Sequence, residues 1–425
     1  MSRLGLLVAP LSAVRLRFAL PLLLISACSV AEVRVLEQKD GGVPDAGQPE
    51  PDADLDADQD AGGTPDAGVA PDAQTCLLPT ADLYSPDLPL NLGPVDEGAA
   101  LRVFPLNGSF AVGLSVGGVP TLRSDESPGD LRRVDGYFGL RGTRGIDGFA
   151  DYRTGRIVAG RTTSGTVAVW NNGEVGSGEY VRRLPVQGLV ADIAPTRGQI
   201  HILSSLEPQT AWVLRVPEHG GQPIVTGTIA AAYPLAQLQL ATNGTRVWEG
   251  SVQAQPGEKT ALFVREIDLG EGALELGPGP SCGVRSYQLV PFGNRLVTVS
   301  ECADESGANT VVELGLHGVE GVISGSSFTM TGTSSPPSRA AWTGQGFVVA
   351  YWPKEERAPS LRFFRADGHP TGAGVIHLAA PAELGHEAIG TALDLAVAPD
   401  FSVGVLTRYG DPDARAYFTR IDPCQ

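Results

Sequence analysis

The sequence predicts an all-β fold: a seven-bladed β-propeller of four-stranded antiparallel blades, preceded by a disordered linker. Two observations in residues 76–425 carry this prediction. Alternating apolar runs recur between glycine-rich turns without a helical period. One unit, a Gly, Asn or Asp turn followed by an apolar strand, also recurs seven times at the spacing typical of propeller blades. A third observation concerns residues 28–75, whose Asp, Ala, Gly and Pro composition cannot bury a core.

The first 27 residues have the organisation of a cleavable signal peptide. Three arginines precede the apolar stretch Phe18–Ala27, which ends at Cys28 in the run LLLISAC. The stretch has about half of the roughly 20 residues that a membrane-spanning helix needs, which favours anchoring over spanning. An ordinary secretory signal, with Cys28 incidental, is the alternative.

The run before Cys28 resembles the lipobox of bacterial lipoproteins. The resemblance implies that Cys28 becomes the lipid-bearing first residue of the mature chain, acylated with a fatty acid such as palmitate. Ser29 follows it, not the aspartate associated with inner-membrane retention, so the resemblance implies the outer membrane.

The linker, residues 28–75, carries much of the acidity of the chain. Residues 29–75 hold twelve acids against Arg34 and Lys39, so their net charge is −10 out of the −17 of the whole sequence. The acid-rich run Asp52–Gly62 lacks the glycine position and closing glutamate of a calcium loop. We therefore expect a solvated, disordered spacer and no metal site in it.

The seven copies of the repeat define the propeller region, residues 76–425. Their turn landmarks are spaced by 47, 43, 46, 49, 53 and 54 residues. The last copy ends after its third strand, whereas a spare strand near Leu88–Gly93 precedes the first. We expect this N-terminal strand to complete the seventh blade and to close the ring. The landmarks are Gly108, Gly155, Gly198, Gly244, Gly293, Gly346 and Asp400.

The cysteines fit this closure. With Cys28 acylated, four cysteines remain, an even number that suits an oxidising compartment. Positions 282 and 302 are symmetric about the turn PFGN, which predicts a Cys282–Cys302 bridge between directly opposed residues of a hairpin. Cys76 and Cys424 flank the two strands joined in the seventh blade, which predicts a second bridge at the seam. Free thiols are the alternative for all four.

No pattern in the sequence indicates catalysis, a cofactor or a metal. The six histidines have no metal-ligand spacing. The run GLSVG around Ser115 matches a nucleophile elbow, but Ser115 ends a strand and enters a turn where the elbow requires a helix. Asn243 begins an Asn-Gly-Thr sequence, which is first a hairpin-turn signal and second a glycosylation acceptor. Arginines and lysines are scattered among acids, which argues against a nucleic-acid partner.

The loops between second and third strands vary most along the repeat. They are expected to gather with the between-blade loops on one face of the propeller, where binding specificity usually resides. Aromatic and charged residues in or near them form the candidate binding face. Packing of the tryptophans between blades is the alternative. The candidates are Trp248, Glu258, Lys259, Asp304, Glu305, Trp352, Lys354, Glu355 and Arg357.

The chain as a whole resembles lipid-anchored cell-envelope proteins of Gram-negative bacteria that carry a β-propeller. The resemblance rests on the lipobox, the Asp/Ala/Pro stalk and the repeat. It implies a non-enzymatic binding or scaffold module, tethered to the membrane through Cys28, for an envelope or extracellular protein or a glycan. The alternative is an extracellular propeller hydrolase or lyase acting on polysaccharide or phosphate esters, so the sequence leaves enzymatic activity open but favours its absence.

Overall fold

The computed structural model describes only part of the chain. The predicted signal peptide, the linker with Cys28, and Cys76, Cys282 and Cys424 lie outside the described residues. All described residues belong to the compact unit Ala70–Gln425, and none of them is helical. The described ranges are 83–84, 88–106, 109–124, 133–136, 145–152, 155–162, 167–172, 179–184, 186–196, 199–217, 223–254, 260–268, 272–278, 283–304, 309–318, 321–330, 336–354, 356–385, 389–410 and 413–422.

The described strands form seven sheets, which we number as blades in chain order. Blade 1 holds β3 (Arg102–Leu106), β4 (Ser109–Val116), β5 (Val119–Ser124) and β6 (Arg133–Gly136). Blade 2 holds β7 (Gly148–Tyr152), β8 (Gly155–Arg161), β9 (Val167–Asn172) and β10 (Glu179–Leu184). Blade 3 holds β11 (Leu189–Thr196), β12 (Gln199–Glu207), β13 (Thr210–Pro217) and β14 (Ile224–Ala230).

The remaining blades repeat this order. Blade 4 holds β15 (Leu235–Thr242), β16 (Val247–Ala254), β17 (Thr260–Asp268) and β18 (Gly272–Pro278). Blade 5 holds β19 (Val284–Phe292), β20 (Arg295–Ala303), β21 (Thr310–Gly318) and β22 (Gly321–Met330). Blade 6 holds β23 (Arg339–Trp342), β24 (Gly346–Tyr351), β25 (Ser360–Arg365), β26 (Pro370–His377) and β1 (Leu83–Tyr84). Blade 7 holds β27 (Ile389–Val397), β28 (Val403–Gly410), β29 (Arg415–Ile421) and β2 (Leu90–Pro94).

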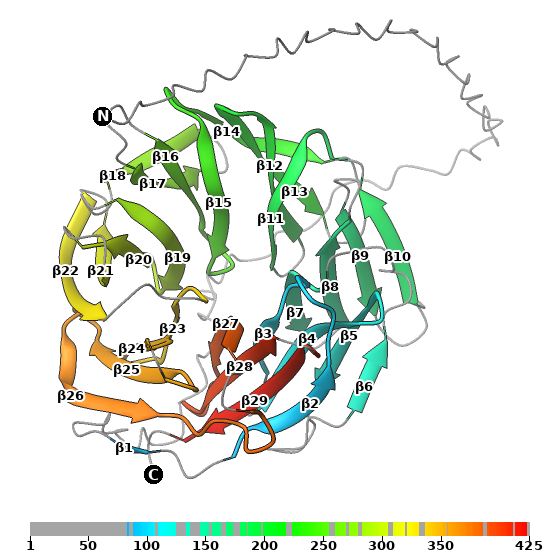
Figure 1. Cartoon of the computed structure of the whole chain (residues 1–425). Helices are drawn as coiled ribbons and strands as arrows, with labels where there is room; N and C mark the ends of the chain where they lie inside the picture. Colours follow the sequence, from blue (N-terminus) through cyan, green and yellow to red (C-terminus); the bar gives the residue numbers. More distant parts are fainter. Residues whose placement is uncertain are drawn as a thin grey trace, which may run out of the picture. The chain divides into compact units, whose positions relative to one another are not determined.

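The sheets stand around a common centre, as in a β-propeller (Figure 1). The first strand of each blade is innermost, and first strands of neighbouring blades lie beside one another, as β11 does beside β15 and β27 beside β3. Six sheets have the four strands that the repeat predicted. The prediction is wrong for blade 6, where β1 pairs in parallel with the outer strand β26 and makes a fifth strand.

The seventh blade is completed by the N-terminal strand, as the sequence predicted. Strand β2 pairs antiparallel with β29, with Leu90 opposite Phe418 and Pro94 opposite Arg415. Leu92, at an irregularity in this ladder, is 2% exposed and packs in a cluster with Phe110 of blade 1 and Phe418 of blade 7. The two ends of the propeller region are therefore joined by both a ladder and a core.

The hydrophobic core is divided into clusters between neighbouring blades. Each of the seven blade junctions has at least one cluster of buried residues, including the junction of blades 7 and 1. Second strands such as β4 and β28 are buried almost without interruption, because both faces of each sheet turn toward a neighbouring sheet. Every blade is thus buried against two others, and the packing continues around the ring.

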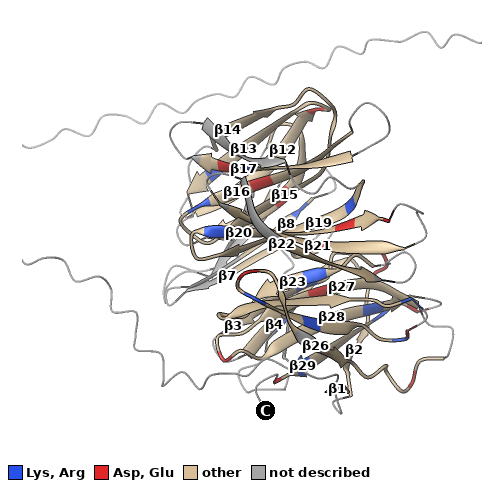
Figure 2. Ribbon diagram, turned by 90° about the vertical axis from the view of Figure 1, so that its left-hand side faces the viewer, with Lys and Arg blue, Asp and Glu red and all other residues tan. Residues whose placement is uncertain are grey.

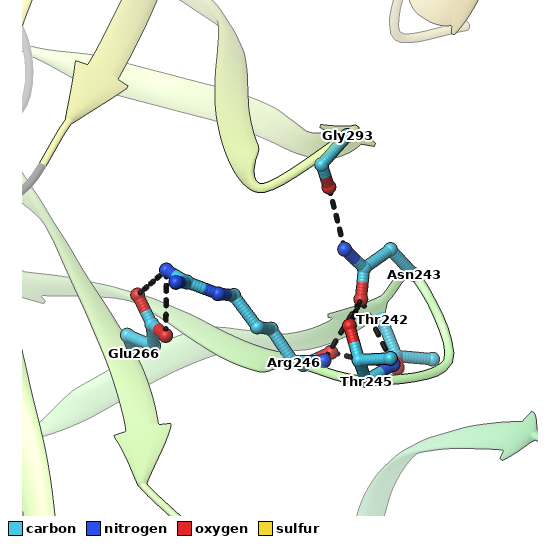
Figure 3. Close-up of polar contacts among 6 residues, drawn as sticks. All are labelled: Thr242, Asn243, Thr245, Arg246, Glu266 and Gly293. Atoms are coloured by element: carbon cyan, nitrogen blue, oxygen red, sulfur yellow. Dashed lines mark hydrogen bonds and ion pairs between the residues drawn. The ribbon is translucent and has the colours of Figure 1, made fainter. Parts of the chain in front are cut away.

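The hairpin of blade 4 shows how the turns hold the blades in register. The Asn243 carboxamide oxygen accepts hydrogen bonds from the backbone N–H groups of Thr245 (3.0 Å) and Arg246 (2.8 Å), and its amide nitrogen donates to the carbonyl of Gly293 in blade 5 (Figure 3). Gly244 adopts a φ of +95°, a conformation that suits glycine. The interpretation of Asn243 as a turn residue is confirmed, and its amide is engaged between two blades.

The cysteine prediction for blade 5 needs correction. Cys302 is buried and disulfide-bonded, but its partner across the β19–β20 ladder is Val284. Phe292 pairs with Arg295, so the turn is centred after residue 292 and the predicted symmetry is wrong. Direct opposition of Cys282 and Cys302 is therefore excluded by the register, whereas the bridge between them stays a prediction.

His201 in β12 supplies a prediction for the pH dependence of stability. The residue is 1% exposed, and burial, reinforced by the positive charge of Arg215, lowers its pKa from 6.5 to about 4. As the pH falls below 6.5, His201 becomes protonated in the unfolded chain but stays neutral in the folded chain until about pH 4. The free energy of unfolding therefore decreases between these two pH values. The full loss is about 3 kcal/mol, from about 1.4 kcal/mol per pKa unit.

The measurement is urea unfolding between pH 7.5 and 4 of the native chain and of a His201→Leu variant. Groups other than His201 titrate in both proteins and cancel in the difference. The native chain should lose stability relative to the variant as the pH falls. Parallel curves for the two proteins would show that His201 does not resist protonation.

Candidate functional site

One face of the propeller carries the loops between second and third strands together with the loops between blades. We call it the loop face. The ladders define it: in blade 3, Leu189 at the start of β11 pairs with Ser205 near the end of β12, next to the turn at Pro208. At the opposite end of the strands, Thr196 at the end of β11 pairs with Gln199 at the start of β12, and Arg215 of β13 pairs with Ile224 at the start of β14. The described candidate residues lie toward one or the other of these two ends.

Trp248 does not belong to the loop face. It is the second residue of β16, close to the hairpin turn at the opposite end, and pairs with Ala241. Its ring is 1% exposed in the cluster between blades 4 and 5, so its role is packing. For Trp248 the structure supports the alternative interpretation, packing between blades.

Trp352 and Arg357 lie on the loop face, but both are used to fold it. Trp352 is 7% exposed; its indole N–H donates to the carbonyl of Glu356 (2.9 Å), and its ring packs edge-on against Tyr409. The Arg357 guanidinium donates to the carbonyls of Leu384 (2.7 Å) and Gly385 (3.0 Å) in the loop before blade 7. These two residues position the loop and offer little surface to a partner.

Of the other candidates, two are described by the structure and four are not. Lys354 is exposed on the loop face, and Asp304 accepts hydrogen bonds from the backbone N–H and amide of Asn309 within its own loop. Four predicted residues lie outside the described residues. They are Glu258, Lys259, Glu305 and Glu355.

Three exposed apolar residues on the loop face were not predicted. Leu189 is 67% exposed at the start of β11, Ile389 is 69% exposed at the start of β27, and Tyr233 is 36% exposed just before β15. All three lie at the beginnings of inner strands, so they stand near the centre of the face, where Tyr233 is carried by a loop bonded to the carbonyls of Pro208 and Gln209. They lie on the face that carries the variable loops, where binding residues are concentrated in proteins with a rigid frame.

A cavity of about 390 Å³ lies among the inner strands. Its wall contains the polar residues Arg102, Asp147, Arg161, Asp192, Gln239, Gln288, Arg339 and Asp394. This volume is within the range of small-molecule sites in proteins. We call this space the central cavity.

The polar residues of the wall come from one repeated register position. In blades 1 to 6 this inner-strand residue pairs with the second-strand residue eleven positions later, as Arg102 pairs with Gly113. In blade 7 the separation is twelve, because Asp394 pairs with Leu406. The position is polar in all blades except blade 2, where it is Gly148 and the preceding Asp147 lines the cavity. The set is Arg102, Gly148, Asp192, Gln239, Gln288, Arg339 and Asp394.

These side chains connect neighbouring blades. Asp192 accepts a hydrogen bond from the backbone N–H of Leu240 (2.8 Å), and Asp394 accepts one from that of Val103 (2.8 Å). Gln239 donates to the carbonyl of Tyr287 (2.8 Å). The connections at other junctions are Gln288 with the backbone of Ala340, Arg161 with the carbonyl of Ala191, and Arg339 with Asp394 at 3.7 Å.

The wall carries three arginines and three aspartates, so its formal charge is zero. Burial raises the pKa of Asp192 and of Asp394, although Arg102 opposes this shift at both carboxyl groups. Burial lowers the pKa of Arg339. Asp147 is paired with Arg161 at 2.7 Å. The wall is therefore an ionic surface whose positive and negative charges balance.

Ser115, considered above as a nucleophile, has a structural role. Its hydroxyl donates to Asp96 (2.5 Å), and the same carboxylate accepts hydrogen bonds from the backbone N–H groups of Gly117 and Gly118. These bonds hold the β4–β5 turn and lower the pKa of Asp96 against the effect of burial. The contact seen at Ser115 is thus that of a turn residue.

The described residues contain neither a metal-binding group nor a membrane-spanning helix. None of their His, Cys, Asp and Glu residues form a group of three or more that could hold a metal ion. No helix among them is long and apolar enough to cross a bilayer. Lys and Arg are interspersed with Asp and Glu along the sheets visible in Figure 2.

Comparison with known proteins gives resemblances of fold only. No family model matches the chain, and no curated protein matches its sequence. The WD40 β-propeller domain of Doa1 has a TM-score of 0.46 and 13% identity, covering 81% of this chain and 99% of that chain. Sqt1 of Saccharomyces cerevisiae has 0.44 and 10%, with coverages of 81% and 99%. A prolyl endopeptidase structure has 0.46 and 12%, with coverages of 79% and 51%; no activity or partner follows from similarity at this level.

Proposed function

We propose that this protein is a non-enzymatic binding module whose loop face receives a protein partner. The observation that carries the proposal is the group of exposed apolar side chains Leu189, Tyr233 and Ile389 at the beginnings of inner strands. They come from separate blades, and the continuous packing between blades fixes their spacing. A rigid frame with apolar anchors binds a preformed surface without a large ordering cost.

A protein partner fits these residues better than a glycan. Glycan surfaces are recognised by aromatic rings together with many hydrogen-bonding groups, whereas Leu189 and Ile389 are aliphatic and have no polar atoms in their side chains. Aliphatic groups gain free energy by leaving water against another apolar surface. The glycan partner is therefore one outcome of the test and not the main proposal.

The proposal includes the membrane tether inferred from the sequence. A lipid on Cys28 would hold the chain at the outer membrane, and the acidic linker, residues 28–75, would separate the propeller from the lipid surface. The partner is then a protein of the cell envelope or its surroundings.

The alternative function is hydrolysis, and its support is the presence of three aspartates on the wall of the central cavity. Paired carboxyl groups are the usual machinery of glycoside hydrolysis. Here Asp147 is bound to Arg161, whereas Asp192 and Asp394 accept backbone N–H groups of the next blade. Because Asp147 is engaged within blade 2 and the other two aspartates join neighbouring blades, we assign the three aspartates to structure and keep the binding module as the conclusion.

The test is affinity capture with the full chain, tagged at its C-terminus, from the envelope of cells that produce it. Tyr233→Asp and Ile389→Asp place a charge on the loop face. Val225→Asp is the matched control, because Val225 is 47% exposed near the start of β14, at the opposite end of blade 3. A protein retained by the native chain and the control but lost by both loop-face variants is the expected result. Equal retention by all four chains, or recovery of glycan alone, would contradict the proposal.

A further inference from the structure

Arg102 differs from the other polar residues of the central cavity. Its counterparts in blades 3 to 7 are each bonded to a neighbouring blade. Among the described residues, the guanidinium of Arg102 has neither a hydrogen bond nor an ion pair, although it lines the same cavity. A guanidinium carries five N–H donors in a fixed plane, so this side chain presents a large unmet bonding capacity.

The unmet capacity at this cavity consists of donors. The Asp147 carboxylate accepts bonds from the backbone and side chain of Arg161, and Asp192 accepts bonds from the N–H groups of Leu240 and Ile193. In contrast, the Nε–H of Arg161 is buried without a hydrogen-bond partner. A ligand that completes the wall must therefore bring acceptors.

Charge leads to the same class of ligand. Arg161 is neutralised by Asp147 at 2.7 Å and Arg339 lies 3.7 Å from Asp394, whereas Arg102 has no carboxylate within ion-pair distance in the described structure. A planar guanidinium binds carboxylate and phosphate groups through two parallel N–H···O bonds. The cavity, at about 390 Å³, has room for a small organic acid as well as for a bare oxyanion.

The cavity is within reach of the loop face. Asp192 lies three residues after Leu189, the exposed first residue of β11, which corresponds to about 10 Å along a strand. Arg102 is the first residue of β3, at the same register position in blade 1. Arg102 therefore lies about 10 Å inside the loop face, measured along the strand.

We propose that the central cavity is a binding site for a small oxyanion, a carboxylate or a phosphate, held in bidentate fashion by the guanidinium of Arg102. The site is independent of the partner surface proposed above, since neither Leu189 nor Tyr233 nor Ile389 contributes to the cavity wall. Asp192 and Asp394 limit its affinity, because their negative charges lie close enough to interact with Arg102.

The experiment is calorimetric titration of the full chain, in detergent and Tris chloride of low ionic strength, with succinate, glucuronate and inorganic phosphate separately. Glucose is the uncharged control ligand. We expect at least one anion to bind and glucose not to bind; the preference between phosphate and the two carboxylates identifies which oxyanion the site takes. The anions are added up to about 20 mM, which is enough to detect a site with a Kd of about 1 mM. Absence of binding by all three anions would overturn the proposal.

Variants locate the site. Arg102→Met should weaken binding about ten- to hundredfold, the range for losing hydrogen bonds to a charged group. Arg295→Met is the matched control, since Arg295 is an exposed arginine at the β19–β20 turn and does not line the cavity. Binding that is unchanged in Arg102→Met, or equally weakened in Arg295→Met, would overturn the assignment.

Two further variants keep the test decisive if Arg102→Met does not fold. Arg102→Lys retains the charge but loses the bidentate geometry, so it should bind more weakly than the native chain. Asp192→Asn removes a negative charge beside Arg102 and should bind the anion more tightly, the opposite direction. Native affinity in both variants would contradict a site at Arg102.

Discussion

Replacing Leu92 with aspartate should open the propeller at its seam and lower the free energy of unfolding by at least about 4 kcal/mol. Leu92 is 2% exposed between blades 7 and 1 and belongs to the strand that joins the two ends of the ring. The substitution removes its apolar contacts and places a charge among the buried apolar side chains of this cluster. Loss of this strand leaves the edge of β29 unpaired, so the damage should extend beyond the cost of one side chain.

The matched control is Leu90→Asp. Leu90 lies two residues earlier in the same strand and is 38% exposed, so a charge there remains in water. Urea unfolding of the two variants and the native chain measures the difference. If Leu92→Asp unfolds at the same urea concentration as Leu90→Asp, strand β2 does not hold the ring closed.

Trp352 and Gly390 should be strongly coupled in a double-mutant cycle. A Cβ atom at Gly390 would lie 2.3–2.5 Å from three carbons of the Trp352 ring. The ring cannot move freely, because its N–H is bonded to Glu356 and it packs on Tyr409. Gly390→Ala should therefore cost about 2 kcal/mol, and Trp352→Ala about 3–5 kcal/mol through loss of packing.

The double variant distinguishes this account from simple additivity. With the ring removed, the added methyl group enters vacated space, so Gly390→Ala should cost less than about 0.5 kcal/mol in the Trp352→Ala background. Thermal unfolding of the four proteins provides the cycle. Additive costs would show that Trp352 does not occupy the space above Gly390, and the description of this part of the loop face would be wrong.

The repeat could be predicted from the sequence because each blade reuses one pattern of turn and strand. Gly244 and Gly293 mark hairpin turns, and the missing outer strand of blade 7 pointed to the residues that form β2. The fifth strand of blade 6 could not be predicted. Its two residues, Leu83 and Tyr84, pair through backbone atoms and have no alternating pattern of their own.

The candidate site was predicted less well, for a physical reason. Trp248 and Trp352 were chosen as aromatic residues near loops, but an aromatic ring near a strand end packs between sheets whenever a neighbouring sheet offers a surface. In six of the seven copies, a polar residue five to seven positions before the landmark turn was visible in the sequence, as in Asp192 and Gln288. Its position on the cavity wall depends on which strand is innermost, a property of the whole ring.

The exposed residues Leu189 and Ile389 illustrate the same limit. Each begins an inner strand with an apolar side chain, and nothing in the local pattern distinguishes such a residue from one that packs on a neighbour. Their exposure, 67% and 69%, depends on the arrangement of the neighbouring blades, which the local sequence does not specify. This surface is the basis of the proposed function.

The most direct test of the binding-module proposal is site-specific photo-crosslinking in cells that produce the full chain. A photoreactive amino acid is placed in turn at positions 189, 233 and 389 of the loop face, and at positions 88 and 225, which are comparably exposed elsewhere. We predict one protein adduct of the same mass from the three loop-face positions and none from the other two. Adducts that form equally at all five positions, or at none, would contradict a partner-binding role for this face.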